Sequence, residues 1–183
     1  MIDAKSPFTA RHSERVAELA VGTAAVLGFD AAVRRTVRRA GLLHDIGKLA
    51  ISNRILDKPG RLTEEEFRAI QTHPTFTLRI LERAPCFAAF ADLAANHHEK
   101  LDGSGYPRGL AAADLDLPMR ILVVADIYEA LTARRPYREP LAPEAALALI
   151  DRDVPVKLDG DVRRALGRHL QRSEDAWQQQ RVA

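Results

Sequence analysis

The sequence predicts an all-α fold, a single-domain helical bundle, from three observations. Alanine, leucine and arginine dominate the 183 residues, and aromatic side chains make up only 5% of them, which favours helices over a β-sandwich. Apolar residues recur at the three-to-four-residue spacing of a helix face. No segment shows the alternation of apolar and polar residues that is typical of a half-buried strand.

Helix start and stop signals divide the chain. Pro7 after Ser6 is a good helix start, because proline is tolerated at the first helical position, and Gly28 ends that helix. Thr63 and Glu66 form a capping box for a later helix. The predicted helices cover residues 6–28, 30–47 (capped by Asp30 and closed by Gly47), 63–73, 86–98, 118–133, 143–151 and 159–172.

Two stretches are expected to interrupt the helices. Residues 50–62 are predicted to be a loop with at most a short helical turn, and residues 99–110 (EKLDGSGYPRGL) a glycine-rich loop. Pro74 should kink or interrupt its helix just after His73, and a further apolar segment follows it. His169 is expected to pack in the core.

Charge and cysteine content narrow the class of protein. Lys and Arg number 27 against 25 Asp and Glu, a balance that does not suggest a DNA- or RNA-binding protein. The single cysteine, Cys86, excludes an internal disulfide and fits a reducing compartment. No apolar run approaches the roughly 20 residues of a membrane span, and no signal peptide is recognisable. We therefore expect a cytoplasmic protein without a membrane segment, with one domain over 1–172 and a frayed tail over 173–183.

The placement of histidines and aspartates is the main functional signal. An isolated inward histidine is usually a hydrogen-bonded core residue, but five of them beside apolar helix faces in the first hundred residues need another explanation. Asp126 lies in RILVVADIYEAL (120–131), which is apolar on almost every side and predicts a buried helix. A buried carboxylate requires a partner, either an arginine or a metal ion. The candidates are His12, His44, Asp45, His73, His97, His98 and Asp126.

These side chains predict a metal centre inside the bundle. Imidazole with carboxylate suits Zn, Fe, Mn or Ni rather than calcium. Seven ligands are too many for one catalytic ion that keeps an open position, but they suffice for two ions about 3.5–4 Å apart, bridged by one carboxylate and a hydroxide. Neighbouring side chains in an ideal helix point about 100° apart, so His97 and His98 can serve one centre only at a helix terminus.

Several motifs resemble the HD-GYP family of the HD phosphohydrolase superfamily. After the first histidine come, in order, HDIGK at 44–48, ILDKPGRLTEEE at 55–66, HP at 73–74, HHEKLDGSGYP at 97–107 and LPMRILVVADIYEALTARRPY at 117–137. The resemblance implies a bundle of helices around a metal cluster. It also implies a phosphodiesterase that opens cyclic di-GMP to pGpG, and often on to GMP, with two divalent ions. Fe or Mn are the favoured metals, and Zn, Ni or Co are compatible.

The resemblance further implies a role for each site residue. One metal would be held by His12, His44, Asp45 and Asp126. A second, to which Asp45 bridges, would be held by His73, His97 and His98. Asp45 and Lys48 are the expected catalytic residues, with Lys48 facing a substrate phosphate and stabilising charge in the transition state.

Further substrate contacts are expected from two segments. Gly103 and Gly105 let the loop turn tightly, and Tyr106 offers a ring for guanine stacking and a hydroxyl donor. Arg135 follows the Asp126 helix, and its guanidinium suits a phosphate, although arginine-rich helix ends are usually solvated surface. Two plainer alternatives stay open. In the first, the glycine-rich loop has only a packing role, and Tyr106 is the side chain that packs. In the second, Lys48 is a solvated lysine at a helix end.

The chain departs from the family pattern at three positions. Some members carry a glutamate four residues before the first histidine and hold three metals, but Phe8 stands there and cannot ligate. We therefore expect two metals, with His12 either a ligand or just outside the centre. Thr77 replaces a common glycine and is expected to alter the pocket floor, and Glu129 stands where aspartate is common.

Two rival functions stay open beside cyclic di-GMP hydrolysis. One is an HD phosphohydrolase of another nucleotide or cyclic dinucleotide, which would share the metal chemistry. The other is a catalytically weak domain that binds cyclic di-GMP or a regulatory partner. The complete two-metal ligand set favours an active enzyme. A homodimer, and a regulatory domain or partner protein, stay open as well.

Overall fold

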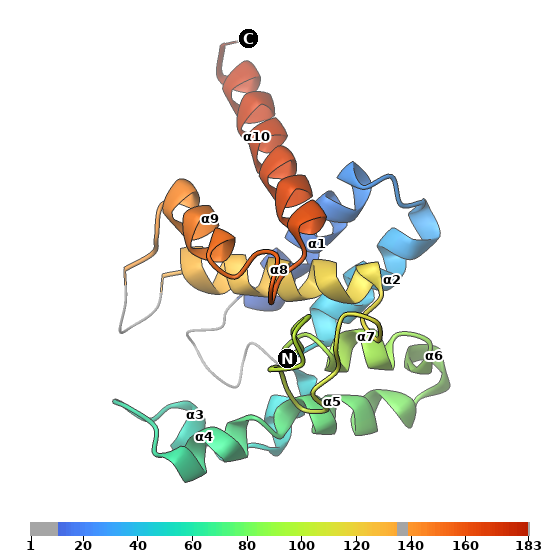
Figure 1. Cartoon of the computed structure of the whole chain (residues 1–183), viewed down its shortest axis with the longest axis vertical. Helices are drawn as coiled ribbons and strands as arrows, with labels where there is room; N and C mark the ends of the chain where they lie inside the picture. The colour runs from blue at the N-terminus through green and yellow to red at the C-terminus, as the bar shows by residue number, and fades with distance from the viewer. Residues whose placement is uncertain (1–10, 135–138, 183) are drawn as a thin grey trace.

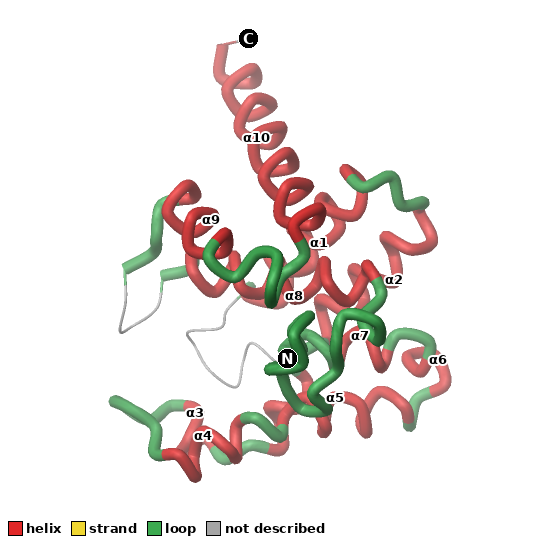
Figure 2. Tube along the Cα trace, viewed as in Figure 1, coloured by secondary structure: helices red, strands yellow, loops and turns green. Residues whose placement is uncertain are grey.

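The computed structural model describes residues 11–134 and 139–182, and in this part of the chain every regular element is a helix (Figures 1 and 2). The elements are α1 (His12–Val26), α2 (Ala31–Leu43), the 3-10 helix η1 (Ile46–Ala50), α3 (Asn53–Leu56), α4 (Glu64–Ile70), α5 (His73–Glu82), α6 (Pro85–Ala88), α7 (Ala91–Ala95), α8 (Leu117–Thr132), α9 (Pro143–Asp151) and α10 (Gly160–Val182). The predicted all-α, single-domain fold is confirmed.

Helix α8 lies at the centre of the molecule and contacts α1, α2, α7, α9 and α10 (Figure 1). Its residues 121–126 are all buried, as the apolar sequence around Asp126 predicts. The core continues into α1 through Val16 and Ala20 and into α10 through Val162 and Leu166. A carboxylate in the middle of α8 therefore sits deep inside the bundle.

Helix starts follow the predicted capping chemistry. Asp30 accepts from the backbone N–H of Val33 at 2.8 Å, and Thr63 with Glu66 forms the complete capping box. Residues 50–62 contain the last residue of η1 and the short α3, and residues 99–110 contain no helix, as expected. These local signals depend on a few neighbouring residues, which is why they can be read from sequence.

Helix boundaries near the histidines differ from the prediction. Helix α2 ends at Leu43 rather than at Gly47, so His44 and Asp45 lie just beyond it. Gly47 instead lies in η1 and permits its close packing against α5, because a Cβ there would lie 1.9 Å from the carbonyl oxygen of His73. The break at Pro74 falls before His73, not after it, since proline fits the first turn of α5.

The predicted helix over 86–98 is two short helices, α6 and α7, and α7 ends at Ala95. His97 and His98 consequently lie in the turn after a helix end, as the tandem histidines require. The last backbone carbonyls of a helix have no partner within the helix, and one of them, that of Ala94, accepts a hydrogen bond from the His97 ring.

The C-terminal segment is helical where fraying is predicted. Helix α10 continues past Ser173 to Val182, because residues 173–182 contain good helix formers and neither glycine nor proline to stop it (Figure 1). Near the middle of this helix the half-buried His169 ring packs on α1, where a Cβ on Gly22 would lie 2.1 Å away. Among the described residues, no helix combines the length and the hydropathy needed to cross a bilayer.

Candidate metal centre

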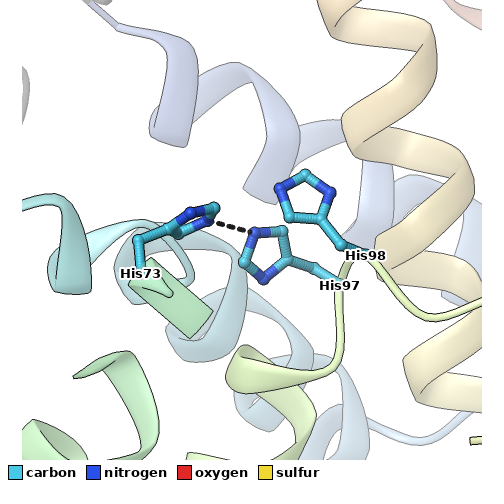
Figure 3. Close-up of side chains that lie close together, drawn as sticks. All are labelled: His73, His97 and His98. Atoms are coloured by element: carbon cyan, nitrogen blue, oxygen red, sulfur yellow. Dashed lines mark hydrogen bonds between the residues drawn. The ribbon is translucent and has the colours of Figure 1, made fainter. Parts of the chain in front are cut away.

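The seven predicted ligands converge on one place inside the bundle. Their donor atoms form three groups, each with all atoms within 4.8 Å of one another: His12, His44 and Asp126; His44, Asp45 and His97; and His73, His97 and His98. We call the first group the first site and the last group the second site. Figure 3 shows the second site, whose three rings turn toward one another from α5 and from the turn after α7.

Three of the histidines are held in the same way, by the backbone of their own turn. In each, Nδ1 lies 2.7 Å from the carbonyl oxygen three residues earlier. The pairs are His44 with Gly41, His73 with Ile70, and His97 with Ala94. A carbonyl can only accept, so Nδ1 carries the proton and the lone pair of Nε2 faces the cluster. This is the tautomer that ligates a metal through Nε2.

The Nε2 atoms of His73 and His97 lie 3.2 Å apart, the contact that the dashed line marks in Figure 3. Burial, together with the neighbouring His98 and His44, holds the pKa of His97 well below its ordinary value, so its ring stays neutral. Two lone pairs at this distance repel unless a cation lies between them. The buried His44 Nε2 and Asp45 Oδ1 also have no hydrogen-bond partner within the described chain. This donor set fits a divalent transition metal.

Asp45 lies between the two sites. Its Oδ2 is 3.5 Å from His44 Nε2 and 3.7 Å from His12 Nε2, while its Oδ1 is 3.3 Å from His73 Nε2. Lys48 donates to Oδ2 at 2.6 Å. Burial would raise the pKa of Asp45, but Lys48 and the adjacent imidazoles hold it well below its ordinary value. The carboxylate is therefore ionised, with one oxygen facing each site.

His12 completes the first site and is held differently from the other rings. Its Nε2 is 3.3 Å from Asp126 Oδ1, and its Nδ1 is hydrogen-bonded to Glu129. Burial lowers the pKa of His12, yet the hydrogen bonds to Asp126 and Glu129 raise it to about 9. At Asp126, burial raises the pKa, but the hydrogen bond with His12 and the neighbouring imidazoles of His44, His97 and His98 outweigh it and lower the pKa. His12 Nε2 thus lies among the candidate donor atoms of the cluster.

The partly exposed side chains Lys48, His98 and Tyr106 mark the open side of the cluster. The Tyr106 ring lies 4.7 Å from the His98 ring at 33°. Burial, with the nearby Asp126 and Asp45 charges, raises the pKa of the Tyr106 hydroxyl, which stays protonated as a donor. The side chain is positioned to meet a group that approaches the cluster from solvent.

The glycine-rich loop is held from inside by Glu99. This fully buried carboxylate accepts the backbone N–H of Arg108 at 2.7 Å and of Leu110 at 2.9 Å. Gly105 packs so closely that a Cβ would lie 2.4 Å from Cα of Glu99, and Gly103 has φ +76°. Both glycines therefore serve the turn that presents Tyr106.

Comparison with known proteins agrees with this arrangement. A family model described as "HD domain" matches residues 1–162. The chain belongs to the HD domain family. The HD-GYP resemblance is confirmed by its curated relatives as well.

Two relatives illustrate how this HD domain compares with characterised proteins. It is 46% identical to the 3′3′-cGAMP-specific phosphodiesterase 3 of Vibrio cholerae over 98% of the chain and 39% of the relative. It is 43% identical to a cyclic di-GMP phosphodiesterase of Thermotoga maritima over 78% of the chain and 39% of the relative. The HD domain therefore spans about two fifths of the length of these curated relatives.

Solved structures match the fold. One is the crystal structure of a cyclic GMP-AMP-specific phosphodiesterase of V. cholerae (V-cGAP3), with 42% identity and a TM-score of 0.58. The match covers 93% of the HD domain and 38% of the V-cGAP3 chain. The HD domain of Listeria monocytogenes PgpH, in complex with cyclic di-AMP, covers 90% at 23% identity and a TM-score of 0.66, over 91% of its own chain. The latter likeness concerns the fold alone.

Two residues of the HD domain do more than the sequence indicates. Glu129, which from sequence is noted only as a departure from the common aspartate, is hydrogen-bonded to His12. The available signal is its place three residues after Asp126 on one buried helix. Thr77 donates to the His44 carbonyl at 2.8 Å and accepts from the Gly47 N–H at 3.0 Å, which joins α5 to η1 beneath the ligands. The positions of Phe8 and Arg135 lie outside the described residues.

Proposed function

We propose that this HD domain is a metal-dependent phosphodiesterase that hydrolyses cyclic di-GMP to pGpG, GMP or both. The observation that carries the proposal is Asp45, whose two ionised oxygens face two separate sets of imidazoles inside the bundle. A carboxylate in that position is suited to bridge two divalent ions. The identity of the chain to cyclic di-GMP phosphodiesterases supports the same reaction.

The proposed ligands are the residues of the two sites. His12, His44 and Asp126 would hold one ion, His73, His97 and His98 the other, and Asp45 both. Fe or Mn are the metals that we favour, with Zn, Ni or Co compatible with the donors. When bound, such a pair lowers the pKa of water toward neutrality and neutralises phosphate oxygens.

The chain's own residues would bind and orient the substrate. The Lys48 ammonium, 2.6 Å from Asp45, is near enough to the cluster to meet a non-bridging phosphate oxygen and to stabilise its growing charge. Tyr106 would stack on guanine or donate its hydroxyl from the open side. Arg135 remains a proposed phosphate contact on sequence grounds.

A second substrate, 3′3′-cGAMP, is favoured by a specific observation. Two relatives from V. cholerae whose names specify this dinucleotide align over 98% and 88% of the chain. Cyclic di-GMP and 3′3′-cGAMP share one guanine and the same phosphodiester linkages, so the metal cluster would treat both alike. Discrimination would then depend on the contacts made by the second base.

The test combines metal analysis with a substrate panel. Anaerobically purified protein should hold close to two transition ions per chain, the number for which the ligands suffice. With Mn or Fe(II), chromatography should detect pGpG or GMP from cyclic di-GMP, while 3′3′-cGAMP and cyclic di-AMP are assayed in parallel. Faster turnover of 3′3′-cGAMP would select the second substrate. Metal-loaded protein that hydrolyses none of the three would contradict the proposed activity.

A further inference from the structure

His12 is oriented differently from His44, His73 and His97. Its Nδ1 is hydrogen-bonded to the Glu129 side chain of another helix, and not, as in those three, to the backbone carbonyl three residues earlier. Arg11, the preceding residue, has φ 66°, in the left-handed region, and its backbone therefore departs from the helix. The Nδ1–H group of His12 takes its acceptor from another element, α8.

Glu129 supplies that acceptor from α8. Its side chain is 2% exposed, and one carboxylate oxygen, Oε2, is bonded to His12 Nδ1. The other, Oε1, accepts from Arg15 Nε at 2.6 Å and lies 2.5 Å from Arg15 Nη2. A buried carboxylate is costly without a cationic partner, and Arg15 provides one while its own side chain stays 43% exposed.

The two metal sites consequently have different surroundings. In the second site, the Nδ1–H groups of His73 and His97 meet neutral carbonyls. In the first site, His12 meets a carboxylate, and Asp126 adds a ligand charge. A carboxylate bonded to Nδ1–H fixes the ring and makes its other nitrogen a stronger donor to a metal.

We propose that Glu129, aligned by Arg15, is a positioning residue that makes the first site bind its divalent ion more tightly than the second site does. The inference rests on the proposed function only in taking the cluster to hold two ions. Arg15 keeps the Glu129 carboxylate directed at His12, and it limits the charge that the bundle must bury. The pair therefore sets the order in which the two sites fill.

The test measures metal affinity directly in metal-stripped protein. Wild type, titrated calorimetrically with Mn²⁺ and followed optically with Co²⁺, should give a tight and a weaker binding event. Glu129→Gln keeps the size of the side chain but loses its charge, and should weaken the tight event by about 10–100-fold while the weak event stays unchanged. Arg15→Gln should have a smaller effect in the same direction, and Glu129→Asp should retain more affinity than Glu129→Gln.

Glu18→Gln is the matched control, since it removes a carboxylate from an exposed position of the same helix α1 and should leave both events unchanged. If Glu129→Gln does not fold, Arg15→Gln makes the same test at a partly exposed residue. The inference alone is overturned if wild type binds two ions with one affinity, or if Glu129→Gln weakens both events equally. Wild type that binds neither Mn²⁺ nor Co²⁺ would overturn the proposed function too.

Discussion

The second site (His73, His97, His98) and the first site (His12, His44, Asp126) differ in how far their ligands depend on the rest of the fold. The rings of His73 and His97 are oriented by carbonyls three residues away, so each forms with its own turn. His12 is oriented by Glu129, 117 positions away in sequence, and only when α1 has packed on α8. The orientation of these two second-site rings is therefore local, as is that of His44 in the first site, whereas the orientation of His12 is a product of tertiary structure.

The largest effect should come from removing the residue that joins the two sites. Asp45→Ala should lose both metals and all measurable turnover together, because one oxygen of Asp45 faces each site. Mass-spectrometric metal analysis and a turnover assay on the same preparation check this. Asp45→Asn is the matched control for size, and should fail similarly since the bridging charge is absent. Retention of two ions by Asp45→Ala would show that the two sites fill independently.

A smaller effect is expected at Lys48, which contacts Asp45 but belongs to neither site. Lys48→Ala should keep its metals and its thermal midpoint, and lose roughly 10²–10³ in rate, the usual size for one electrostatic stabiliser. Such a result would show that Lys48 stabilises charge on the substrate and does not bind or support the metals. Hydrolysis by Lys48→Ala at the wild-type rate would remove Lys48 from the catalytic residues, and loss of metal would make it a support for Asp45.

The same contrast explains what could be predicted from sequence. The caps at Asp30 and Thr63 and the buried helix around Asp126 depend on residues close in sequence, so local patterns sufficed. The tandem His97–His98 demanded a helix end, and α7 ends just before them.

Tertiary contacts account for what was missed. The sequence predicts Gly47 to be a helix stop, whereas in the structure its small size allows η1 to pack closely against α5. The role of Glu129 was missed because nothing near it in sequence reveals that its carboxylate is the hydrogen-bond partner of His12. The continuation of α10 beyond Ser173 also differs from the predicted frayed tail, although its helix-forming composition was visible.

The smallest expected effect concerns Thr77, whose hydroxyl supports the backbone from which His44 extends. Thr77→Val keeps the shape but leaves the buried His44 carbonyl and Gly47 N–H without that partner. The free energy of unfolding should fall by about 1–3 kcal/mol, the usual cost of unsatisfied buried groups. For a domain of this size that lowers the thermal midpoint by roughly 2–10 °C.

Thr77→Ser keeps the hydroxyl, so its free energy of unfolding should stay close to that of wild type. This control separates the effect of the hydrogen bonds from that of the methyl group.

Metal titration of Thr77→Val tests the comparison between the two sites further. Thr77 lies beneath the His44 turn and not beneath Glu129, so Thr77→Val should lower the stability of metal-free protein without removing the difference between the two binding events. If that difference vanishes in Thr77→Val while Glu129 is intact, the asymmetry originates in the backbone around His44 rather than in the carboxylate that orients His12.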